Sequence, residues 1–375
     1  MSHLEPLRQR AACALKTAFV GDALAMPVHW YYNPADIFRQ FPGGIQGFEA
    51  APANHPSSIM SLHSTAQGGR RSGRQTSRDI VGEVILKGRR KYWGDSRLHY
   101  HHGMQAGQNT LNAHCARVLM RSLAGCKGHY YDPAPFLQAY IDYMTADPPR
   151  HPDTYAESYH RGFFANLEAG RPADQCGAVT HDTASIGGLV TIAPLVFAER
   201  LSGTGVADIQ EIAHRHLMLT HPDQALGEVC GSYVALLCDL LACETRDQAR
   251  GIIAACARDS ARLDLPRLLD RNRSDFEIVG GLFSSACYIS GSWPSVLYLA
   301  YRYLGDSRAA LLNNANLGGD NVHRGFVLGT ILGLTEWEST ATLFGQLQDC
   351  RELHSEINAL LPACGLPSDA VPPVN

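Results

Sequence analysis

A run of polar residues, Gly318-Gly319-Asp320-Asn321-Val322-His323-Arg324, lies between two apolar segments that are typical of helices. A carboxylate, an amide, an imidazole and a guanidinium cost free energy when they are buried without polar partners, so we expect this run to line a cavity. The two glycines permit a turn and a close approach of the backbone to a ligand. Asp320 is therefore a candidate acid/base or the anchor of a single metal ion, and His323 is a candidate assisting group. Candidate substrate contacts in the same run are Gly318, Gly319, Asn321 and Arg324.

A second candidate lies near the N-terminus, where an apolar helical stripe runs into Gly21-Asp22-Ala23-Leu24. Asp22 thus comes at the end of a buried helix, and His29 follows after Pro27 and Val28. Both are candidate substrate-binding residues. The alternative interpretation for Asp22 is that it only caps a helix.

Gln108, Asn109 and Thr110 open a strong helical stripe that begins at Leu111. Amide oxygens can ligate a divalent cation such as Mg²⁺, and a family resemblance, given below, implies that role, beside Asp320, for Gln108, Asn109 and Thr110. They bring no negative charge to offset the dehydration of that ion, so they would hold it weakly. Helix capping by Asn109 and Thr110 is the alternative interpretation.

Two further candidates lie in the middle of the chain. Ser185-Ile186-Gly187-Gly188 is a run of small residues in which glycine permits close approach to a ligand, although it could equally mark tight helix packing. We take Ser185 and Gly187 as candidate substrate-binding residues, with Asp182 nearby as a further assisting group. His221, at a junction between two helical stripes, is a candidate catalytic residue, and a structural role is its alternative.

The elements that must position these residues are helices. Apolar residues recur at helical spacing, whereas alternation of period two is hard to find, so an all-α fold in one compact domain over residues 1–365 is predicted. The predicted helices cover about 4–20, 111–125, 133–144, 207–218, 223–243, 246–257, 294–304, 307–314, 324–334 and 338–360.

Two stretches break the helical pattern. Residues 42–78 are rich in Gly, Pro, Ser and His and end in Arg70, Arg71, Arg74 and Arg78, which indicates a loop insertion, either a lid or a surface segment. Residues 366–375 contain three prolines and are predicted to form a flexible tail.

Composition excludes some classes of function. The 375 residues carry a formal charge of -4, which provides no strong field for nucleic acid or a membrane surface. The first ten residues lack an apolar signal core, and no apolar run was expected to reach the ~18 residues of a membrane span. The 11 cysteines include no C-x-x-C pair and are predicted to be buried thiols. We therefore expect a cytoplasmic protein that binds neither nucleic acid nor membrane.

Taken in order, these motifs resemble those of the ADP-ribosylglycohydrolases. The family carries Gly-Asp-Ala-Leu-Gly-x-Pro near its N-terminus, ending in a glutamate whose place falls on His29 here. It then carries Thr-Asp-Asp-Thr at the start of a helix, a Gly-Asn-Gly segment, a Thr-His pair beside the ribose site, and Gly-Gly-Asp-Thr-Asp near the C-terminal end. The variants Ala-Gly-x-Asn-Thr-Leu-Asn-Ala and Gly-Gly-Asp-Asn-x-His-Arg resemble the divergent branch that includes the J1 crystallins.

The resemblance implies hydrolysis of an N- or O-glycosidic bond at the anomeric carbon of ADP-ribose, with two Mg²⁺ ions held by carboxylates. Here Gln108, Asn109 and Val322 stand where three of four motif carboxylates are expected, and Asp320 keeps the fourth place. A binuclear centre with one carboxylate is electrostatically unfavourable, so Mg²⁺ is expected to be single and weakly held, or lost.

Three hypotheses follow. The chain is a hydrolase acting on a small-molecule or protein-linked ADP-ribose-like substrate, a catalytically silent protein that binds ADP-ribose or a related nucleotide, or a structural protein like the crystallins. The polar residues kept at the old ligand positions favour the hydrolase, because apolar residues would stabilise a core better. The family resemblance predicts that Asp22, Asn109, His221 and Asp320 converge on one cleft although they are distant in sequence.

Overall fold

The computed structural model describes residues 4–60, 78–125 and 131–361. In these ranges the chain forms helices, and β structure is confined to isolated bridges such as the one between Ser185 and Tyr288. The predicted all-α class is confirmed.

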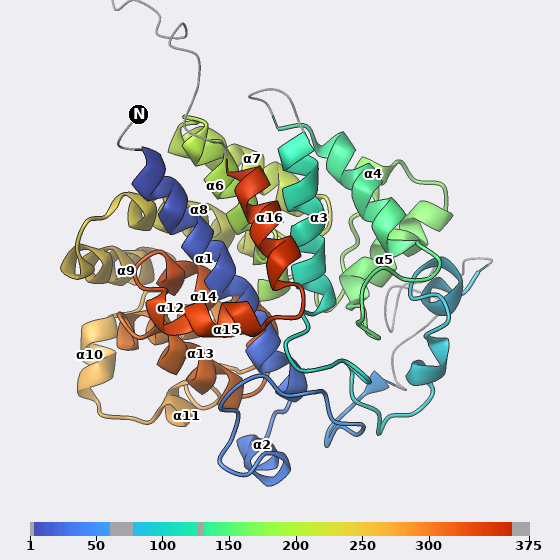
Figure 1. The fold of residues 1–375 in the computed structure, drawn as a ribbon, viewed down its shortest axis with the longest axis horizontal. Coiled ribbons are helices and arrows are strands. Elements are labelled where there is room, and N and C mark those ends of the chain that lie inside the picture. The colour runs from blue at the N-terminus through green and yellow to red at the C-terminus, as the bar shows by residue number, and fades with distance from the viewer. Residues whose placement is uncertain (1–3, 61–77, 126–130, 362–375) are drawn as a thin grey trace, which may run out of the picture.

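The helices are joined by connections of very different length, and the longest runs from the end of α2 to the start of α3 (Figure 1). Their bounds are α1 Leu4–Ala25, α2 Pro34–Gln40, α3 Leu111–Gly125, α4 Pro133–Met144, α5 Ser158–Glu168, α6 Ile192–Leu201, α7 Val206–Met218, α8 Gln224–Ala242, α9 Arg246–Ala261, α10 Leu265–Asp270, α11 Asp275–Ile278, α12 Ile289–Arg302, α13 Ser307–Asn316, α14 Asn321–Gly333, α15 Ala341–Gln346 and α16 Cys350–Leu360. Short 3₁₀ turns include Met26–Val28 and Ile186–Leu189.

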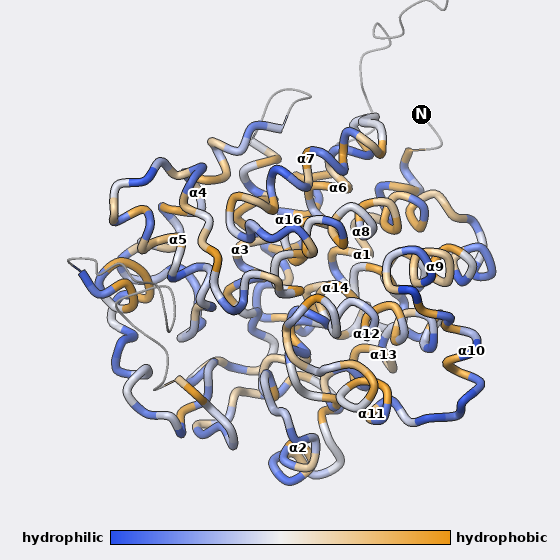
Figure 2. Tube along the Cα trace, turned by 180° about the vertical axis from the view of Figure 1, so that it is seen from behind, coloured by the Kyte–Doolittle hydropathy of each residue, from blue (hydrophilic) through white to orange (hydrophobic). Residues whose placement is uncertain are grey.

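The centre of the fold is the antiparallel pair α1 and α14 (Figure 1). A Cβ atom added to Gly21 would stand 2.2 Å from the carbonyl oxygen of Gly325, so only glycine permits this approach of the two backbones. The pairing brings the C-terminal end of α1, with Asp22, beside the first turns of α14. Hydrophilic residues gather away from this central pair, in outer connections such as the one after α10 (Figure 2).

The predicted helices are found with small shifts at their ends, and the exceptions have physical causes. The stripe predicted over 338–360 is three pieces, because Leu347 is extended and the N–H of Gln348 donates to the carbonyl of Gly107 instead of continuing the helix. Five helices, α2, α5, α6, α10 and α11, were not predicted. Helix α5 is buried on every side over its first two turns, where polar Ser158, His160 and Arg161 alternate with aromatic residues, so its sequence shows no one-sided apolar stripe.

The loop predicted over 42–78 is described only in part. Residues 61–77, with Arg70, Arg71 and Arg74, lie outside the described residues, as does the predicted tail 366–375. The described first part packs against the protein. His55 Nε2 lies 2.9 Å from the carbonyl oxygen of His29, and the Asn316 side chain bonds both the N–H and the carbonyl of Ile45. Residues 42–60 thus help to hold the segment that carries His29.

Contrary to the sequence-based expectation, two segments are long and apolar enough to cross a membrane, namely Leu4–Val28 and Gln224–Ala242. The apolar window of the first is 100% buried in the fold and that of the second 56%. Core helices of soluble proteins pass the same test, so length and composition do not assign a membrane here. The cysteines in the described ranges are unpaired, as predicted, and most are buried.

Candidate active site

Asp320 lies directly before α14, after a turn in which Gly318 and Gly319 both have φ near 65°. A Cβ atom on Gly319 would stand 2.0 Å from the carbonyl oxygen of Ser285, so the turn requires glycine there. The turn is tied to the segment after α1, because the Trp30 N–H donates to the Gly319 carbonyl and the Gly319 N–H donates to the Tyr31 carbonyl, both at 2.8 Å. These bonds bring His29 to Asp320.

The Asp320 carboxylate is fully buried and meets two imidazoles through one oxygen. Its Oδ1 lies 3.0 Å from Nε2 of His29 and 2.8 Å from Nδ1 of His323. The contact with His323 is not aligned as a hydrogen bond, and Oδ2 of Asp320 makes no hydrogen bond within the described part of the chain. His29, Asp320 and His323 form a buried cluster that could hold a metal ion, with one ligand atom from each lying within 4.8 Å of the others.

Behind His29 the contacts continue to a second carboxylate. His29 Nδ1 lies 2.7 Å from Nε2 of His101, and His101 Nδ1 lies 2.8 Å from Oδ1 of Asp153. The Leu111 N–H, at the start of α3, donates to the other oxygen of Asp153 at 2.8 Å. Asp153 therefore fixes the orientation of His101, and through it that of His29.

The other ring nitrogen of His323 faces a third carboxylate. His323 Nε2 lies 3.3 Å from Oε1 of Glu157 and 2.7 Å from the amide nitrogen of Asn112. Asn112 is held in turn by His160, whose Nε2 lies 2.7 Å from the Asn112 amide oxygen. Glu157 Oε2 is buried and, among the described residues, has no hydrogen-bond partner.

The electrostatics of the cluster are set by burial and by these contacts. Burial opposes the ionisation of Asp320, but the charge of His323 and the hydrogen bond with His29 outweigh it and hold the pKa of Asp320 far below its usual range. Burial lowers the pKa of His29 to about 3. Burial also opposes the charge on His323, but Asp320 and Glu157 outweigh it and raise the pKa of His323 well above its usual value. In the metal-free chain the cluster thus holds an ionised Asp320 beside a charged His323.

The expected magnesium ligands have other partners. The Asn109 amide donates to Oδ1 of Asp22 at 2.7 Å, and the Thr110 hydroxyl donates to Oδ2 of Asp22 at 2.6 Å. Gln108, near an outer cavity, donates its amide to Gln348 at 3.0 Å. Val322 is buried in an apolar cluster. These hydrogen bonds go to groups other than Asp320, so the residues present do not fit a centre in which several oxygen ligands hold magnesium.

Asp22 is a buried acceptor at the end of α1. Burial raises its pKa, and the hydrogen bonds from Thr110 and Asn109 work in the opposite direction. Both carboxylate oxygens have donors, so this geometry agrees with the structural interpretation of Asp22, in which it ties α1 to the start of α3.

The mid-chain candidates lie against the cluster. A Cβ atom on Gly187 would stand 3.4 Å from Nδ1 of His323, and one on Gly188 would stand 3.0 Å from the ring of His221. Ser185 begins the same turn. His221 packs on Tyr159 with ring centroids 3.9 Å apart, and its buried Nε2 has no hydrogen-bond partner in the described ranges. Gly187 and His221 thus lie close to His323 although they are distant in sequence.

Two candidate substrate-binding residues support the turn instead. The Asn321 amide donates to the carbonyls of Ala315 and Val28, at 2.9 and 3.3 Å. The buried Arg324 guanidinium donates to Asn314 at 2.7 Å and to the Gly318 carbonyl at 2.8 Å. Both side chains hold the backbone that carries Asp320.

Sequence reasoning missed the partners of the cluster, namely His101, Asn112, Asp153, Glu157 and His160. A usable signal was the density of titratable groups in His99-Tyr100-His101-His102 and in Asp153 to His160. Spacing along the chain did not reveal that these segments meet His29 and His323.

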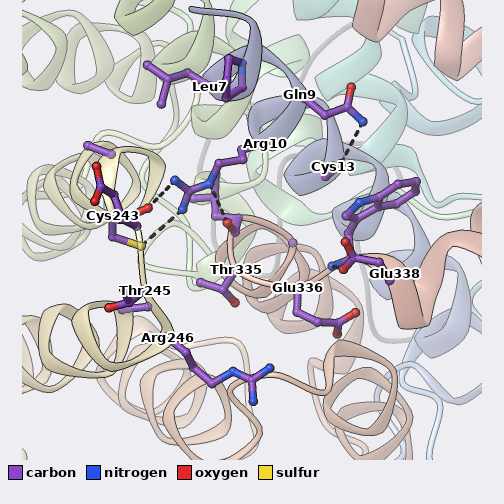
Figure 3. Close-up of a pocket in the computed structure, with 17 residues that line it drawn as sticks. Leu7, Gln9, Arg10, Cys13, Cys243, Thr245, Arg246, Thr335, Glu336 and Glu338 are labelled. Carbon is purple, nitrogen blue, oxygen red and sulfur yellow. Dashed lines mark hydrogen bonds between the residues drawn. The ribbon is translucent and has the colours of Figure 1, made fainter. Parts of the chain in front are cut away.

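A separate cavity of about 730 Å³ opens where α14 ends, and its lining residues on α1, from Pro6 to Cys13, lie toward the opposite end of that helix from Asp22 (Figure 3). Arg10 lies in it and donates to the carbonyl oxygens of Leu334, Cys243 and Leu240, which close the C-terminal ends of α14 and α8. Its guanidinium therefore offsets the negative ends of two helices. None of the residues that line it belongs to the Asp320 cluster.

The fold and the motifs agree with comparisons to known proteins. The family model of the ADP-ribosylglycohydrolases matches residues 4–336, and the chain belongs to this family. It is also similar to a solved chain of an "ADP-ribosylglycohydrolase-related protein complex", with 18% sequence identity, a TM-score of 0.58, and coverage of 95% of this chain and 98% of that one. No curated protein sequence matches this chain.

Proposed function

We propose that this protein hydrolyses an N- or O-glycosidic bond of an ADP-ribosyl or related ribosyl substrate, with Asp320 at the centre of the reaction. Membership of the family supports the reaction class. The substrate, a small molecule or a group linked to a protein, would be bound by the turns at Gly318 and Gly187. Of these, Gly187 lies close to His323, and Gly318 belongs to the turn that precedes Asp320.

The observation that carries the proposal is the buried cluster of carboxylates and imidazoles. Asp320, Glu157 and Asp153 are at most 6% exposed, and His29, His101 and His323 at most 2%. Burying such groups costs more than burying apolar residues of similar size, so they are not needed for a stable core. Their retention in continuous contact supports chemistry at this place rather than a purely structural role.

Each residue has a part in the proposed reaction. Asp320 is kept ionised, and its Oδ2 would take a proton from a water molecule. The water oxygen would bond to the anomeric carbon as the bond from that carbon to the leaving nitrogen or oxygen breaks, and Asp320 would pass the proton to the leaving group. His29 and His323 hold the other oxygen and so fix the carboxylate. His221 would bind a ribose hydroxyl through its buried Nε2, which has no hydrogen-bond partner among the described residues. Positive charge on His323 would keep Asp320 from being protonated too early.

For magnesium we infer that the ion is lost, or single and weakly held, because its expected oxygen ligands bond to Asp22 and Gln348 instead. No step above depends on it.

A second candidate function is binding of ADP-ribose without turnover. The replacement of three motif carboxylates by Gln108, Asn109 and Val322 favours it. A structural role like that of the J1 crystallins would require the cluster to have no ligand at all.

The proposal is tested by incubating the purified chain with peptides that carry ADP-ribose on arginine or on serine, and by measuring released ADP-ribose by chromatography. Calorimetry with ADP-ribose measures binding in parallel. Release from either peptide supports the hydrolase, and binding without release supports the silent binder. If neither release nor binding is observed, the structural role is favoured.

A further inference from the structure

The ligand atoms around Asp320 differ in kind from those that magnesium requires. Two are imidazole nitrogens, Nε2 of His29 and Nδ1 of His323, and one is a carboxylate oxygen. Magnesium prefers six oxygen ligands and keeps several waters, whereas imidazole nitrogen suits zinc and other late first-row metals. From this set we propose that His29, Asp320 and His323 bind one transition-metal ion, with Zn²⁺ as the simplest case, in place of the family's magnesium. The inference deepens the proposed function by naming a cofactor, and the binding itself rests on geometry alone.

The distances suit one shared ion. Two ligand atoms that each stand ~2.0–2.1 Å from zinc are about 2.9 Å apart at a right angle and about 3.3 Å apart at the tetrahedral angle. In the structure the two imidazole nitrogens stand 3.0 and 2.8 Å from Oδ1 of Asp320. Two of the three pairs of ligand atoms therefore already have the separation that one shared ion requires, and the third pair lies within 4.8 Å.

Two buried atoms of the cluster are not satisfied by the protein. Nδ1 of His323 lies close to Asp320 without the alignment of a hydrogen bond, and Oδ2 of Asp320 has no donor in the described ranges. Leaving buried polar atoms in this state costs free energy, which a bound cation would recover.

The outer contacts match those of metal-bound histidines. A histidine that ligates a metal usually gives its other ring N–H to a carboxylate or another acceptor, which fixes the tautomer. His323 Nε2 faces Glu157, and His29 Nδ1 faces His101, which faces Asp153. Both proposed ligands thus have an acceptor on the correct side of the ring.

The test uses the full chain after its metal has been removed by a chelator and dialysis. Co²⁺ is titrated in, and its visible absorption reports nitrogen and oxygen ligation; Zn²⁺ and Mg²⁺ are then titrated by calorimetry. We expect one Co²⁺ or Zn²⁺ per chain, and an affinity for Zn²⁺ at least ~100-fold above that for Mg²⁺.

The variants His29→Gln and His323→Gln should weaken binding by at least ~100-fold and change the cobalt spectrum, because each removes a ligand. Asp153→Asn keeps every ligand and should weaken binding by about 10-fold or more, since it removes an outer acceptor. His354→Gln, exposed on α16, is the matched control and should bind like the unmodified chain. Circular dichroism checks that each variant is folded.

Absence of one tightly bound Co²⁺ or Zn²⁺ in the unmodified chain would overturn the inference, as would a cobalt spectrum that the two ligand variants leave unchanged. Zinc binding without glycosidic turnover would contradict the proposed function but not the metal site. Turnover that survives full removal of metal, in a chain that binds no zinc, would contradict the metal site but not the proposed function.

Discussion

His29 and His101 face each other nitrogen to nitrogen, Nδ1 to Nε2, at 2.7 Å, and both rings are buried. One of the two nitrogens carries a proton and the other accepts it. The proton belongs to His29 Nδ1 when His29 Nε2 meets Asp320 as a lone pair, and to His101 Nε2 when a neutral His29 donates its Nε2–H to Asp320. The state of His29 is thus decided by what binds at Asp320.

Asp153 should act as a positioning residue. Asp153→Asn keeps the shape but weakens the contact that orients His101, so kcat of the proposed reaction should fall by ~10–100-fold while KM changes little. The variant should also lose ~1–3 kcal/mol of stability, because the carboxylate accepts from the buried N–H groups of Leu111 and Tyr155. Steady-state kinetics and denaturant unfolding measure both. A variant with unchanged kcat would show that His29 needs no such support.

Restoring a motif carboxylate at Asn109 should not restore magnesium. Asn109→Asp replaces a donor to Asp22 by a second carboxylate 2.7 Å away, so one of the two must stay protonated or repel the other. We expect a lower melting temperature at neutral pH and no tight Mg²⁺ binding by calorimetry. Thr110→Ser, which keeps the hydroxyl donor to Asp22, is the control. Tight magnesium binding by Asn109→Asp would show that the ligand set can reform.

Buried histidines outside the cluster should make the fold sensitive to acid. Burial lowers the pKa of His216 to about 3, and its ring contacts Tyr131 and Thr191. Below its unfolded pKa of ~6.5 the unfolded chain takes up a proton that the folded chain refuses, so this contribution is complete above that pH and is lost as the pH falls toward 3.

For His216 alone the loss is about 1.4 kcal/mol per pH unit in that window. His216→Gln should therefore flatten the dependence of unfolding free energy on pH between about 6 and 4, even if the variant is less stable at neutral pH. Urea unfolding at several pH values measures the slope. An unchanged slope would mean that His216 is already protonated in the folded chain.

Much of the framework could be predicted from local patterns. The apolar stripe that ends at Asp22 and the stripe after Asp320 are helices, and the family motifs lie in the expected order because each is a short local signal. Their convergence near His323 followed from the resemblance rather than from spacing.

The rest depends on tertiary packing. Asp153 and His101 lie in irregular segments, where no periodicity tells which side chains face inward. Glu157 directly precedes α5, a helix that buries polar and aromatic residues alike. The amide of Asn109 and the hydroxyl of Thr110 could have faced a metal, and only the packing of α1 against the start of α3 shows that they face Asp22. Local sequence patterns thus indicated which segments form the candidate site but not which side chains contact Asp320, His29 and His323.

The most direct measurement is the rate of ADP-ribose release by Asp320→Asn relative to the unmodified chain. Asp239→Asn, exposed on α8, serves as the control. Removing a positioned acid/base typically costs ~10²–10⁴ in rate, so we predict a loss of this size in Asp320→Asn. Helical content should be retained, but the melting temperature should fall, because the substitution leaves the buried charge of His323 without one of its two carboxylate partners. A folded Asp320→Asn variant that releases ADP-ribose as fast as the Asp239→Asn control would contradict the account.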